Sequence, residues 1–340
     1  MSKVAVVGGG SFGTVIANIT ALNGYSVRFW MRSEELAEQI NSTHENSLYL
    51  PGYRLSDGLV ATHNMEAVAA SNMVFVAVPS NSFRSVVKQL QTYVASNTIL
   101  VSTTKGIEAG RFLLMSQVLD EECPGSRIGV LSGPNLAREI AAGHPTGTVI
   151  ASTDKNVQAT VREVLKSEHF RVYTNDDMFG VELGGSLKNI YAIIAGIAQA
   201  SGLGYNTNSM LVTRSLAEMA RFGRKLGADP MTFLGLAGVG DLVVTCSTPL
   251  SRNFRIGQML GHGESIDRAI KDLDQVAEGI NTVKLVKDKA DELEVYMPLV
   301  SGLYKIIYEN ESISSMTSSL MLSEQMLDVD FETVAEKGLL

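Results

Sequence analysis

The chain has 340 residues, 45% of them hydrophobic and 19% charged, a composition typical of a globular protein long enough for two domains. Its 28 Lys and Arg against 36 Asp and Glu leave a net charge of −8, which argues against a general nucleic-acid-binding surface. An anionic ligand would have to be bound by a few local cations rather than by a broad basic field.

The first predicted element is a buried parallel strand over Lys3–Val7, followed by the G-x-G-x-x-G pattern Gly8–Gly13. Apolar residues then recur at helical spacing until Gly24. In this context Gly8 permits a tight turn, Gly10 lets the backbone approach a pyrophosphate, and Gly13 lets helix and strand pack closely. The helix N-terminus adds amide donors and partial positive charge. The order strand, glycine loop and helix therefore predicts dinucleotide binding.

The second predicted strand, Ser26–Trp30, is followed by Met31, Arg32 and Ser33. Enzymes strict for NAD usually place Asp or Glu about 20 residues beyond the motif, to bind the ribose 2′-hydroxyl. A guanidinium and a hydroxyl suit a 2′-phosphate instead. We therefore expect NADP(H) to be favoured and NAD(H) to be tolerated, although Arg32 could equally be a solvated surface arginine.

Further apolar runs alternate with helical patterns through the first half, which predicts βαβ units in an α/β, Rossmann-type doubly wound sheet. Ligands of such sheets bind beyond the carboxyl ends of the strands, where Lys105 and the loop Ser132–Asn135 follow two of the runs. The predicted strands are Met73–Val78, Thr98–Ser102, Ile128–Leu131, Gly147–Ser152 and Phe170–Tyr173.

Strand patterns cease near Phe179, and helical patterns follow at roughly 179–202, 207–226, 252–260 and 279–292. The sequence thus predicts a dinucleotide-binding domain over 1–180 and an all-helical substrate and catalytic domain over 181–340. The most apolar of these stretches, Ile190 to Ala200, is too short to span a bilayer and is expected to be a buried core helix.

Lys188 lies in the Gly-rich opening of that apolar helix, Glu182–Asn189. Burying an ammonium without a partner is costly, so Lys188 either extends to solvent or faces a polar cleft, where it could donate or accept a proton.

A second segment, Gly235–Leu242, carries Asp241 beside several glycines that would let the backbone approach a ligand. After it, Ser251 is predicted to cap a helix with Arg252 and Asn253 in the first turn. A helix N-terminus with an added guanidinium is suited to bind phosphate, although an ordinary capped helix with a surface arginine would look the same.

Taken in order, these motifs and the sequences Thr104-Lys105-Gly106, Gly133-Pro134-Asn135 and Leu187-Lys188-Asn189 resemble the bacterial-type NAD(P)-dependent glycerol-3-phosphate dehydrogenase family over nearly the whole chain. The resemblance implies reversible reduction of dihydroxyacetone phosphate to sn-glycerol 3-phosphate for phospholipid synthesis. It implies that Lys188 is the catalytic acid/base and that Lys105 touches both substrate and cofactor.

The resemblance also implies two sets of ligand contacts. The substrate would meet Gly133, Asn135, Asp241, Ser251, Arg252 and Asn253, in addition to the two lysines. The cofactor would meet Ser11, Phe12, Arg32, Ala137, Arg252, Val276 and Glu278. Two positions depart from the family pattern: Asn135 stands where Ser or Thr is common, and Ala277 interrupts a Val-Glu-Gly sequence.

The chemistry agrees with that resemblance, because a ketone reduction needs a hydride from the cofactor and a proton from a group such as Lys188. Two alternatives remain open. A related dehydrogenase could act on a 3-hydroxy acid with Arg252 as a carboxylate clamp, or the chain could be a non-catalytic NADP(H)-binding redox sensor. Activity with hydroxy acids would favour the first, and cofactor binding without turnover the second.

The remaining signals concern compartment and assembly. Cys123 and Cys246 lack metal-ligand spacing and the histidines are scattered, so no metal is expected and the reducing cytosol fits best. The N-terminus enters a strand at once, which leaves no room for a signal peptide, and a cytoplasmic protein is expected. The apolar helices of the second half leave open either a homodimer interface or an internal core.

Overall fold

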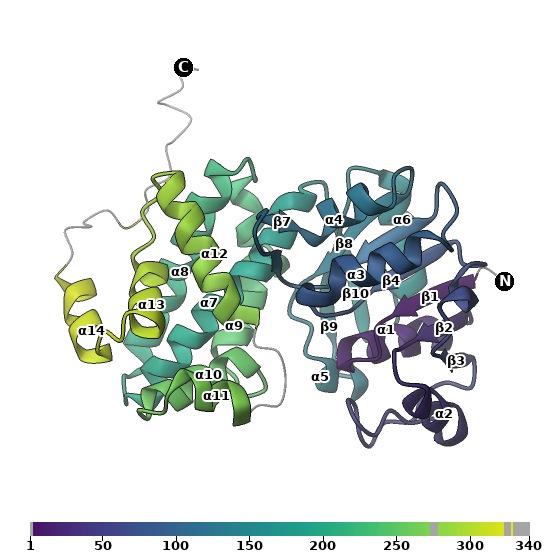
Figure 1. Cartoon of the computed structure of the whole chain (residues 1–340), viewed down its shortest axis with the longest axis horizontal. Coiled ribbons are helices and arrows are strands. Elements are labelled where there is room, and N and C mark those ends of the chain that lie inside the picture. The colour runs from purple at the N-terminus through teal and green to yellow at the C-terminus, as the bar shows by residue number, and fades with distance from the viewer. Residues whose placement is uncertain (1–2, 273–277, 323–327, 329–340) are drawn as a thin grey trace, which may run out of the picture. The chain divides into compact units, whose positions relative to one another are not determined.

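The computed structural model describes residues 3–272, 278–322 and 328. These residues form two compact units. Residues 3–186 and 234–241 make up the first, and 187–233 with the described residues from 242 onward make up the second. Each unit is described by itself below (Figure 1).

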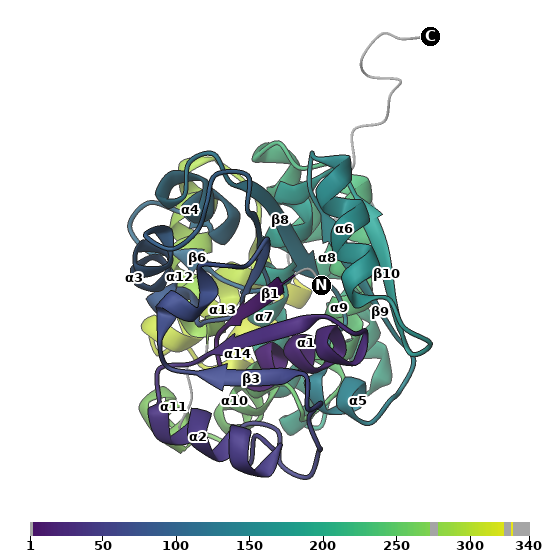
Figure 2. The same cartoon turned by 90° about the vertical axis from the view of Figure 1, so that its right-hand side faces the viewer.

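The first unit is built on one eight-stranded sheet with the order β10-β9-β8-β5-β4-β1-β2-β3, so that β10 and β3 are its edges (Figure 2). A separate antiparallel pair, β6 with β7, follows the loop after β5. The strands are β1 (Lys3–Val7), β2 (Ser26–Trp30), β3 (Leu59–Thr62), β4 (Met73–Val76), β5 (Ile99–Ser102), β6 (Ile107–Glu108), β7 (Leu113–Leu114), β8 (Arg127–Ser132), β9 (Thr146–Ala151) and β10 (Phe170–Asn175).

Helices cover both faces of this sheet, as expected for a doubly wound fold (Figure 1). One core contains residues of α1 (Ser11–Leu22), α2 (Glu34–Thr43), α5 (Ala137–Ala141) and α6 (Lys155–Leu165). The other contains residues of α3 (Ser80–Gln91), α4 (Met115–Glu122) and the 3-10 helix η1 (Met65–Val68). Every residue of β4 and β5 is buried, which explains their uninterrupted apolar sequences.

The direction of β9 determines which residues lie together at the end of the sheet where the parallel strands have their carboxyl ends and where ligands bind. In the eight-stranded sheet, the neighbours from β8 through β5, β4, β1 and β2 to β3 all pair in parallel, but β9 runs antiparallel to β8, with Ser132 opposite Val149. The amino end of β9 therefore lies at the same end of the sheet as the carboxyl ends of β1, β5 and β8. The expectation of βαβ units holds for the first strands and is wrong at β8–β9, where only the five-residue helix α5 intervenes.

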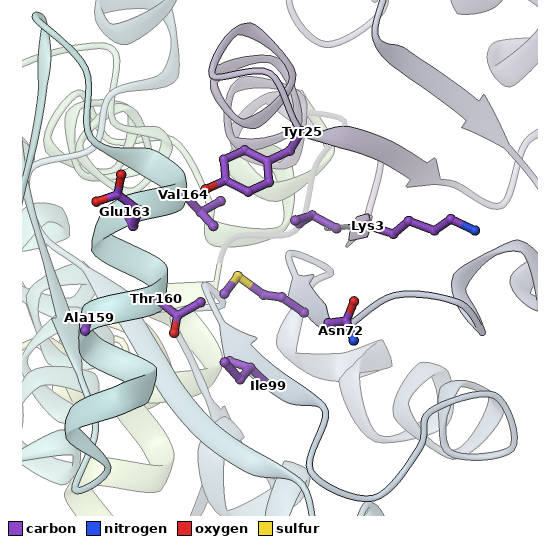
Figure 3. Close-up of a pocket in the computed structure, with 10 residues that line it drawn as sticks. Lys3, Tyr25, Asn72, Ile99, Ala159, Thr160, Glu163 and Val164 are labelled. Atoms are coloured by element: carbon purple, nitrogen blue, oxygen red, sulfur yellow. The ribbon is translucent and has the colours of Figure 1, made fainter. Parts of the chain in front are cut away.

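A surface pocket of the first unit lies at the opposite end of the sheet, where the parallel strands begin (Figure 3). Its lining includes Lys3, Met73 and Ile99, which begin β1, β4 and β5, together with residues of α6. Ligands of doubly wound sheets bind at the carboxyl ends of the strands. The position of this pocket therefore sets it apart from the site built below.

The second unit consists of helices. It contains the later part of α7 (Met178–Ala200), whose first residues belong to the first unit, and most of α9 (Asp241–Cys246). The others are α8 (Tyr205–Lys225), η2 (Pro230–Leu234, except its last residue), α10 (Arg252–Gly261), α11 (Ile266–Asp272), α12 (Glu278–Glu292), α13 (Pro298–Tyr308) and α14 (Ile313–Met321). The helix predicted at roughly 179–202 is confirmed as α7, with the apolar stretch from Ile190 as its later part. No described helix is long and apolar enough to cross a membrane.

Two glycines let α7 and α10 cross in backbone contact. A Cβ at Gly196 would stand 2.0 Å from the Phe254 carbonyl oxygen, and one at Gly257 would stand 1.9 Å from that of Ile193. Neither side chain could be added without separating the helices. The crossing therefore fixes where α10 begins relative to the part of α7 that carries Lys188.

A buried glutamate caps a helix in each unit. In the first unit the Glu182 carboxylate accepts a hydrogen bond from Ser116 N at 3.0 Å, at the start of α4. In the second, Glu218 accepts from Leu299 N at 2.6 Å, at the start of α13, and from the Tyr191 hydroxyl at 3.2 Å. Burial raises the pKa of Glu182 and of Glu218 to about 7 in each case, although the hydrogen bonds act in the opposite direction.

Candidate functional site

The glycine loop after β1 has the geometry expected of a pyrophosphate-binding turn. Gly8 has φ +126°, and a Cβ there would stand 2.4 Å from the Ala77 carbonyl oxygen. A Cβ at Gly13 would stand 2.0 Å from the Gly8 carbonyl oxygen, whereas one at Gly10 would meet nothing within 4 Å. Gly8 and Gly13 are thus required by packing, and Gly10 keeps the approach to the loop open.

The N-terminus of α1 fits a dinucleotide phosphate. Its N-cap, Gly10, offers no side-chain cap, and the first turn carries no acidic residue, so its amide donors are left for a ligand. Ser11 is the first helical residue and donates from Oγ to the Tyr49 carbonyl at 2.7 Å. Phe12 is partly buried against the sheet.

The sequence analysis did not identify Asn46, whose side chain hydrogen-bonds to the backbone of the glycine loop. Its side chain is fully buried, and Nδ2 donates to the Gly9 carbonyl at 2.9 Å and to Thr14 Oγ1 at 2.8 Å. Its Oδ1 accepts from Tyr49 N at 3.2 Å. A polar residue outside any periodic apolar pattern gives no sequence signal of such a contact, so only the fold could reveal it.

Arg32 lies just beyond β2, exposed, at the position where a ribose-binding carboxylate would otherwise stand. The next residue, Ser33, caps α2 by accepting from Leu36 N at 3.1 Å. Glu34 and Glu35 follow in the first turn of α2. An exposed guanidinium at this point can meet a 2′-phosphate without first breaking an ion pair, since Arg32 makes none among the described residues.

The second group in this unit surrounds Lys105, in the loop after β5. Lys105 Nζ lies 2.6 Å from Asp241 Oδ2 and donates to the Gly133 carbonyl at 3.1 Å. Asp241 is buried and follows the π-helix η3 (Leu236–Gly240). Gly185, on α7, leaves space beside Ser132, because a Cβ there would stand 2.7 Å from Ser132 Oγ. Lys105, Gly133, Asn135 and Asp241 are called the Lys105 cluster below.

Asn135 completes this cluster from the loop after β8. Its Nδ2 donates to Thr148 Oγ1 at 2.9 Å, and its buried Oδ1 has no hydrogen-bond partner. Ala137, the first residue of α5, packs partly buried against the core of the sheet. Sequence reasoning missed Thr148, because it took no account of the direction of β9.

In the second unit, Lys188 is a buried residue of α7. Its ammonium donates to Thr245 Oγ1, on α9, at 2.6 Å. A threonine hydroxyl can both donate and accept hydrogen bonds, so it can remain bonded when the lysine changes protonation state. The Lys188 side chain is therefore buried beside a polar group and does not extend to solvent. Of the two alternatives raised by the sequence, extension to solvent is wrong.

Two helix N-termini meet the same stretch of α7. Ser251 caps α10 by accepting from Phe254 N at 3.3 Å, and Arg252 follows it exposed. The buried Asn253 accepts from Gly279 N, at the start of α12, at 3.2 Å. A Cβ at Gly279 would stand 2.8 Å from the Asn189 carbonyl oxygen, so α7, α10 and α12 touch there.

Lys188, Thr245, Ser251–Asn253 and Glu278 are called the Lys188 cluster below. Glu278 is the first residue of α12, and the predicted cofactor contact Val276 lies outside the described residues. Helix N-termini with a guanidinium beside them favour a phosphate. Among the residues that the structure describes, no group of three or more His, Cys, Asp or Glu could hold a metal ion.

Both halves of the chain match families of known proteins. Residues 3–158 match the family described as NAD-dependent glycerol-3-phosphate dehydrogenase N-terminus, and residues 177–318 match its C-terminus. The chain is 52% identical over 330 residues to a Saccharophagus degradans protein named glycerol-3-phosphate dehydrogenase (NAD(P)+), covering 97% of this chain and 92% of that one.

Other relatives give the same result. A Pseudomonas aeruginosa protein of the same name is 53% identical over 96% of each chain. The crystal structure of glycerol-3-phosphate dehydrogenase from Coxiella burnetii superimposes with a TM-score of 0.90 at 34% identity, covering 95% of this chain and 99% of that one. This chain belongs to the NAD-dependent glycerol-3-phosphate dehydrogenase family.

Proposed function

We propose that this protein catalyses the reversible, NAD(P)-dependent reduction of dihydroxyacetone phosphate to sn-glycerol 3-phosphate. The observation that carries the proposal is Lys188, a buried ammonium on the stretch of α7 that meets two helix N-termini, where it is hydrogen-bonded to Thr245 of α9. A proton donor beside a phosphate-binding arrangement is what reduction of a phosphorylated ketone requires. The names of the two bacterial relatives reported above support the same activity.

The cofactor binds beyond the carboxyl ends of the parallel strands. Its pyrophosphate lies against the N-terminus of α1, with Gly8, Gly10, Ser11, Phe12 and Gly13 around it. Arg32 binds the 2′-phosphate, so NADPH is preferred and NADH is accepted. Further cofactor contacts come from Lys105, Ala137, Arg252, Val276 and Glu278.

The substrate phosphate binds at the start of α10. Ser251, Arg252 and Asn253 offer a helix N-terminus, a guanidinium and an amide there. Because the phosphate takes no part in the reaction, its binding energy serves to position the carbonyl group.

The acid/base step belongs to Lys188. Bound reduced nicotinamide supplies the hydride that goes to the carbonyl carbon. Lys188 polarises the carbonyl as an ammonium and gives its proton to the oxygen, and Thr245 keeps the amine oriented afterwards. Lys105, fixed by Asp241 and Gly133, contributes positive charge that binds substrate and cofactor. Gly133, Asn135 and Asp241 complete the substrate contacts.

The biological setting follows from the product. sn-Glycerol 3-phosphate feeds glycerophospholipid synthesis, and we place the protein in the cytoplasm, where both cofactor and substrate occur. Residues 1–180 act as the dinucleotide-binding domain and 181–340 as the substrate and catalytic domain. The chain is expected to work as a homodimer or a monomer, and sedimentation of the purified protein would distinguish the two.

The decisive experiment follows NADPH oxidation with dihydroxyacetone phosphate and with unphosphorylated dihydroxyacetone. We expect turnover with the first and a far smaller kcat/KM with the second. Arg252→Ala should raise KM, lower kcat and lose most of that discrimination, because phosphate binding positions the carbonyl. Oxidation of NADPH only with 3-oxo acids, or binding of NADPH without turnover on either ketone, would contradict the proposal.

A further inference from the structure

One arginine of the first unit joins the strand after Lys105 to two helices. Arg84, on α3, donates from Nε to Glu108 Oε1 at 2.5 Å and from Nη2 to Glu108 Oε2 at 2.8 Å, which makes a bidentate pair with β6. It also donates to Glu121 at 2.9 Å and to Glu122, both on α4. The elements α3, α4 and β6 therefore meet at one guanidinium (Figure 2). Arg84 and its three carboxylates are called the Arg84 network below.

The Arg84 network is better shielded from water than an ordinary surface ion pair. The side chains of Arg84, Glu108 and Glu122 are 22%, 19% and 15% exposed. An isolated exposed pair contributes little to stability, whereas a bidentate arginine inside a network holds its partners in a defined geometry.

The three carboxylates of this network depend on the arginine to lie near one another. Hydrogen bonds from Arg84 lower the pKa of Glu108 below its ordinary value, although burial acts in the opposite direction. The like charge of Glu121 also acts in the opposite direction, which shows that the carboxylates repel each other. Without the guanidinium, β6 would be pushed away from α4.

The hairpin that contains Glu108 is too small to fix its own position. Its strands β6 and β7 have two residues each and form a sheet separate from the main one. A lone two-stranded hairpin is at best marginally stable in water. Burial of Ile107 and Leu114 holds its inner face, and Arg84 attaches its outer end to the helices through Glu108. The position of β6 therefore depends on the Arg84 network.

Lys105 lies between this strand and the main sheet. Before it, β5 is paired with strands on both sides, so the chain enters the segment from a fixed point. After it, Glu108 follows only three residues later. The ammonium has to reach Asp241 Oδ2 at 2.6 Å and the Gly133 carbonyl at 3.1 Å, so a displacement of β6 would disturb both contacts.

We propose that Arg84 is a positioning residue for Lys105, because it holds Glu108 against α4 and so fixes the far end of the segment that carries the lysine. The inference rests on the proposed function, in which Lys105 binds substrate and cofactor. Arg84 acts through Glu108 in this role and touches neither ligand.

The test is a double-mutant cycle between Arg84 and Lys105, measured as kcat/KM for dihydroxyacetone phosphate. Arg84→Ala should lower kcat/KM by about 10- to 100-fold, the loss expected when a binding group is misplaced by roughly 1 Å. In the Lys105→Ala background the same change should cost less than about 3-fold, because the group that Arg84 positions is already absent. Arg84→Lys should not restore kcat/KM, since an ammonium cannot form the paired hydrogen bonds to Glu108.

Glu108→Ala provides a second variant in case Arg84→Ala folds poorly. It leaves Arg84 paired with Glu121 and Glu122, so no carboxylate loses its cation. It should lower kcat/KM in the same direction and lose most of that effect in the Lys105→Ala background. The same cycle on calorimetric affinity for sn-glycerol 3-phosphate provides a readout besides turnover.

The matched control is Lys88→Ala, on the same helix one turn later. The Lys88 ammonium lies 3.9 Å from Glu122, outside the connection to β6, and its removal should leave kcat/KM unchanged. An equal loss with and without Lys105, in both Arg84→Ala and Glu108→Ala, would overturn the proposal and leave the network a purely structural one. Unchanged kcat/KM in both variants would overturn it as well. A wild-type protein without turnover on dihydroxyacetone phosphate would instead refute the proposed function.

Discussion

The two compact units each hold a lysine in a candidate site, but the hydrogen-bond partners described for the two lysines differ. Lys105 forms an ion pair with the buried Asp241 carboxylate at 2.6 Å and also donates to a backbone carbonyl. Lys188 is more deeply buried and donates to the hydroxyl of Thr245 at 2.6 Å. An ionised carboxylate can only accept hydrogen bonds, whereas a hydroxyl can both donate and accept them.

This difference teaches that the residue type alone does not assign a role. Lys105, held by a carboxylate and a backbone carbonyl, is suited to bind and orient an anionic ligand. Lys188, buried and hydrogen-bonded to the Thr245 hydroxyl, is the lysine proposed above to give and take a proton. We therefore expect the two lysines to respond differently to the same experiments.

The largest expected effect comes from Lys188→Ala. Turnover should fall by about 10²- to 10⁴-fold, because the proton donor is lost in the chemical step. Lys188→Arg should not restore it, since a guanidinium stays protonated and has a different shape. Single-turnover rates, NADPH affinity and thermal stability measured on one preparation check this.

Lys105→Ala is the comparison variant for this prediction. It should weaken the affinity for substrate and cofactor as well as turnover, whereas Lys188→Ala should leave NADPH affinity near that of the wild type. Near-normal turnover in Lys188→Ala, together with reduced stability, would assign Lys188 a structural role and remove the contrast between the two lysines.

The buried glutamates Glu182 and Glu218 should make the units alike in their response to pH. The pKa of each folded carboxyl, about 7, lies above the ordinary 4.5, so between these values the folded state binds more protons than the unfolded state. The free energy of unfolding should therefore fall as pH rises through this window, by up to about 3 kcal/mol per carboxyl.

Urea unfolding at pH 5 and pH 7.5 tests this on the wild type, Glu182→Gln and Glu218→Gln. Each variant should lose the part of the pH dependence contributed by its own carboxyl, while the glutamine oxygen can still accept a hydrogen bond from the helix N-terminus at every pH. A wild-type protein that becomes more stable from pH 5 to pH 7.5, with variants of the same slope, would contradict the assignment.

The smallest expected effect belongs to Arg32, the exposed cation of the first unit. Arg32→Ala should weaken NADPH binding more than NADH binding, by about 1–3 kcal/mol if a charge-assisted contact to the 2′-phosphate is lost. Fluorescence titration of both cofactors measures the difference. Equal weakening of the two would show that Arg32 does not contact the 2′-phosphate.

Most of the fold could be predicted from the sequence because the central strands are buried on both faces and carry unbroken apolar runs. The edge strand β3 was missed, since Val60 is exposed and the four-residue pattern is too short to stand out. The predicted strand over Met73–Val78 ends at Val76, where the chain turns so that the Ala77 carbonyl faces Gly8.

Those parts of the candidate site were predictable in which a residue type has one characteristic structural role, such as glycine in a tight turn or serine at a helix N-cap. The glycines of the loop and the helix-capping Ser251 are of this kind. Asn46 and Thr148 were not predictable, because each contributes through a partner that only the fold brings near it. In the case of Thr148 the missing fact was the direction of a single strand.

The glycine crossing of α7 and α10 has a consequence for anyone who wishes to make this protein more heat-resistant. Glycine inside a helix costs about 0.5–1 kcal/mol relative to alanine, so Gly196 and Gly257 are obvious targets for stabilising replacement. Here the added methyl group would stand about 2 Å from a carbonyl oxygen of the other helix. Replacement would drive α10 outward and carry Arg252 and Asn253 with it, so a stabilisation campaign should exclude both positions from its library.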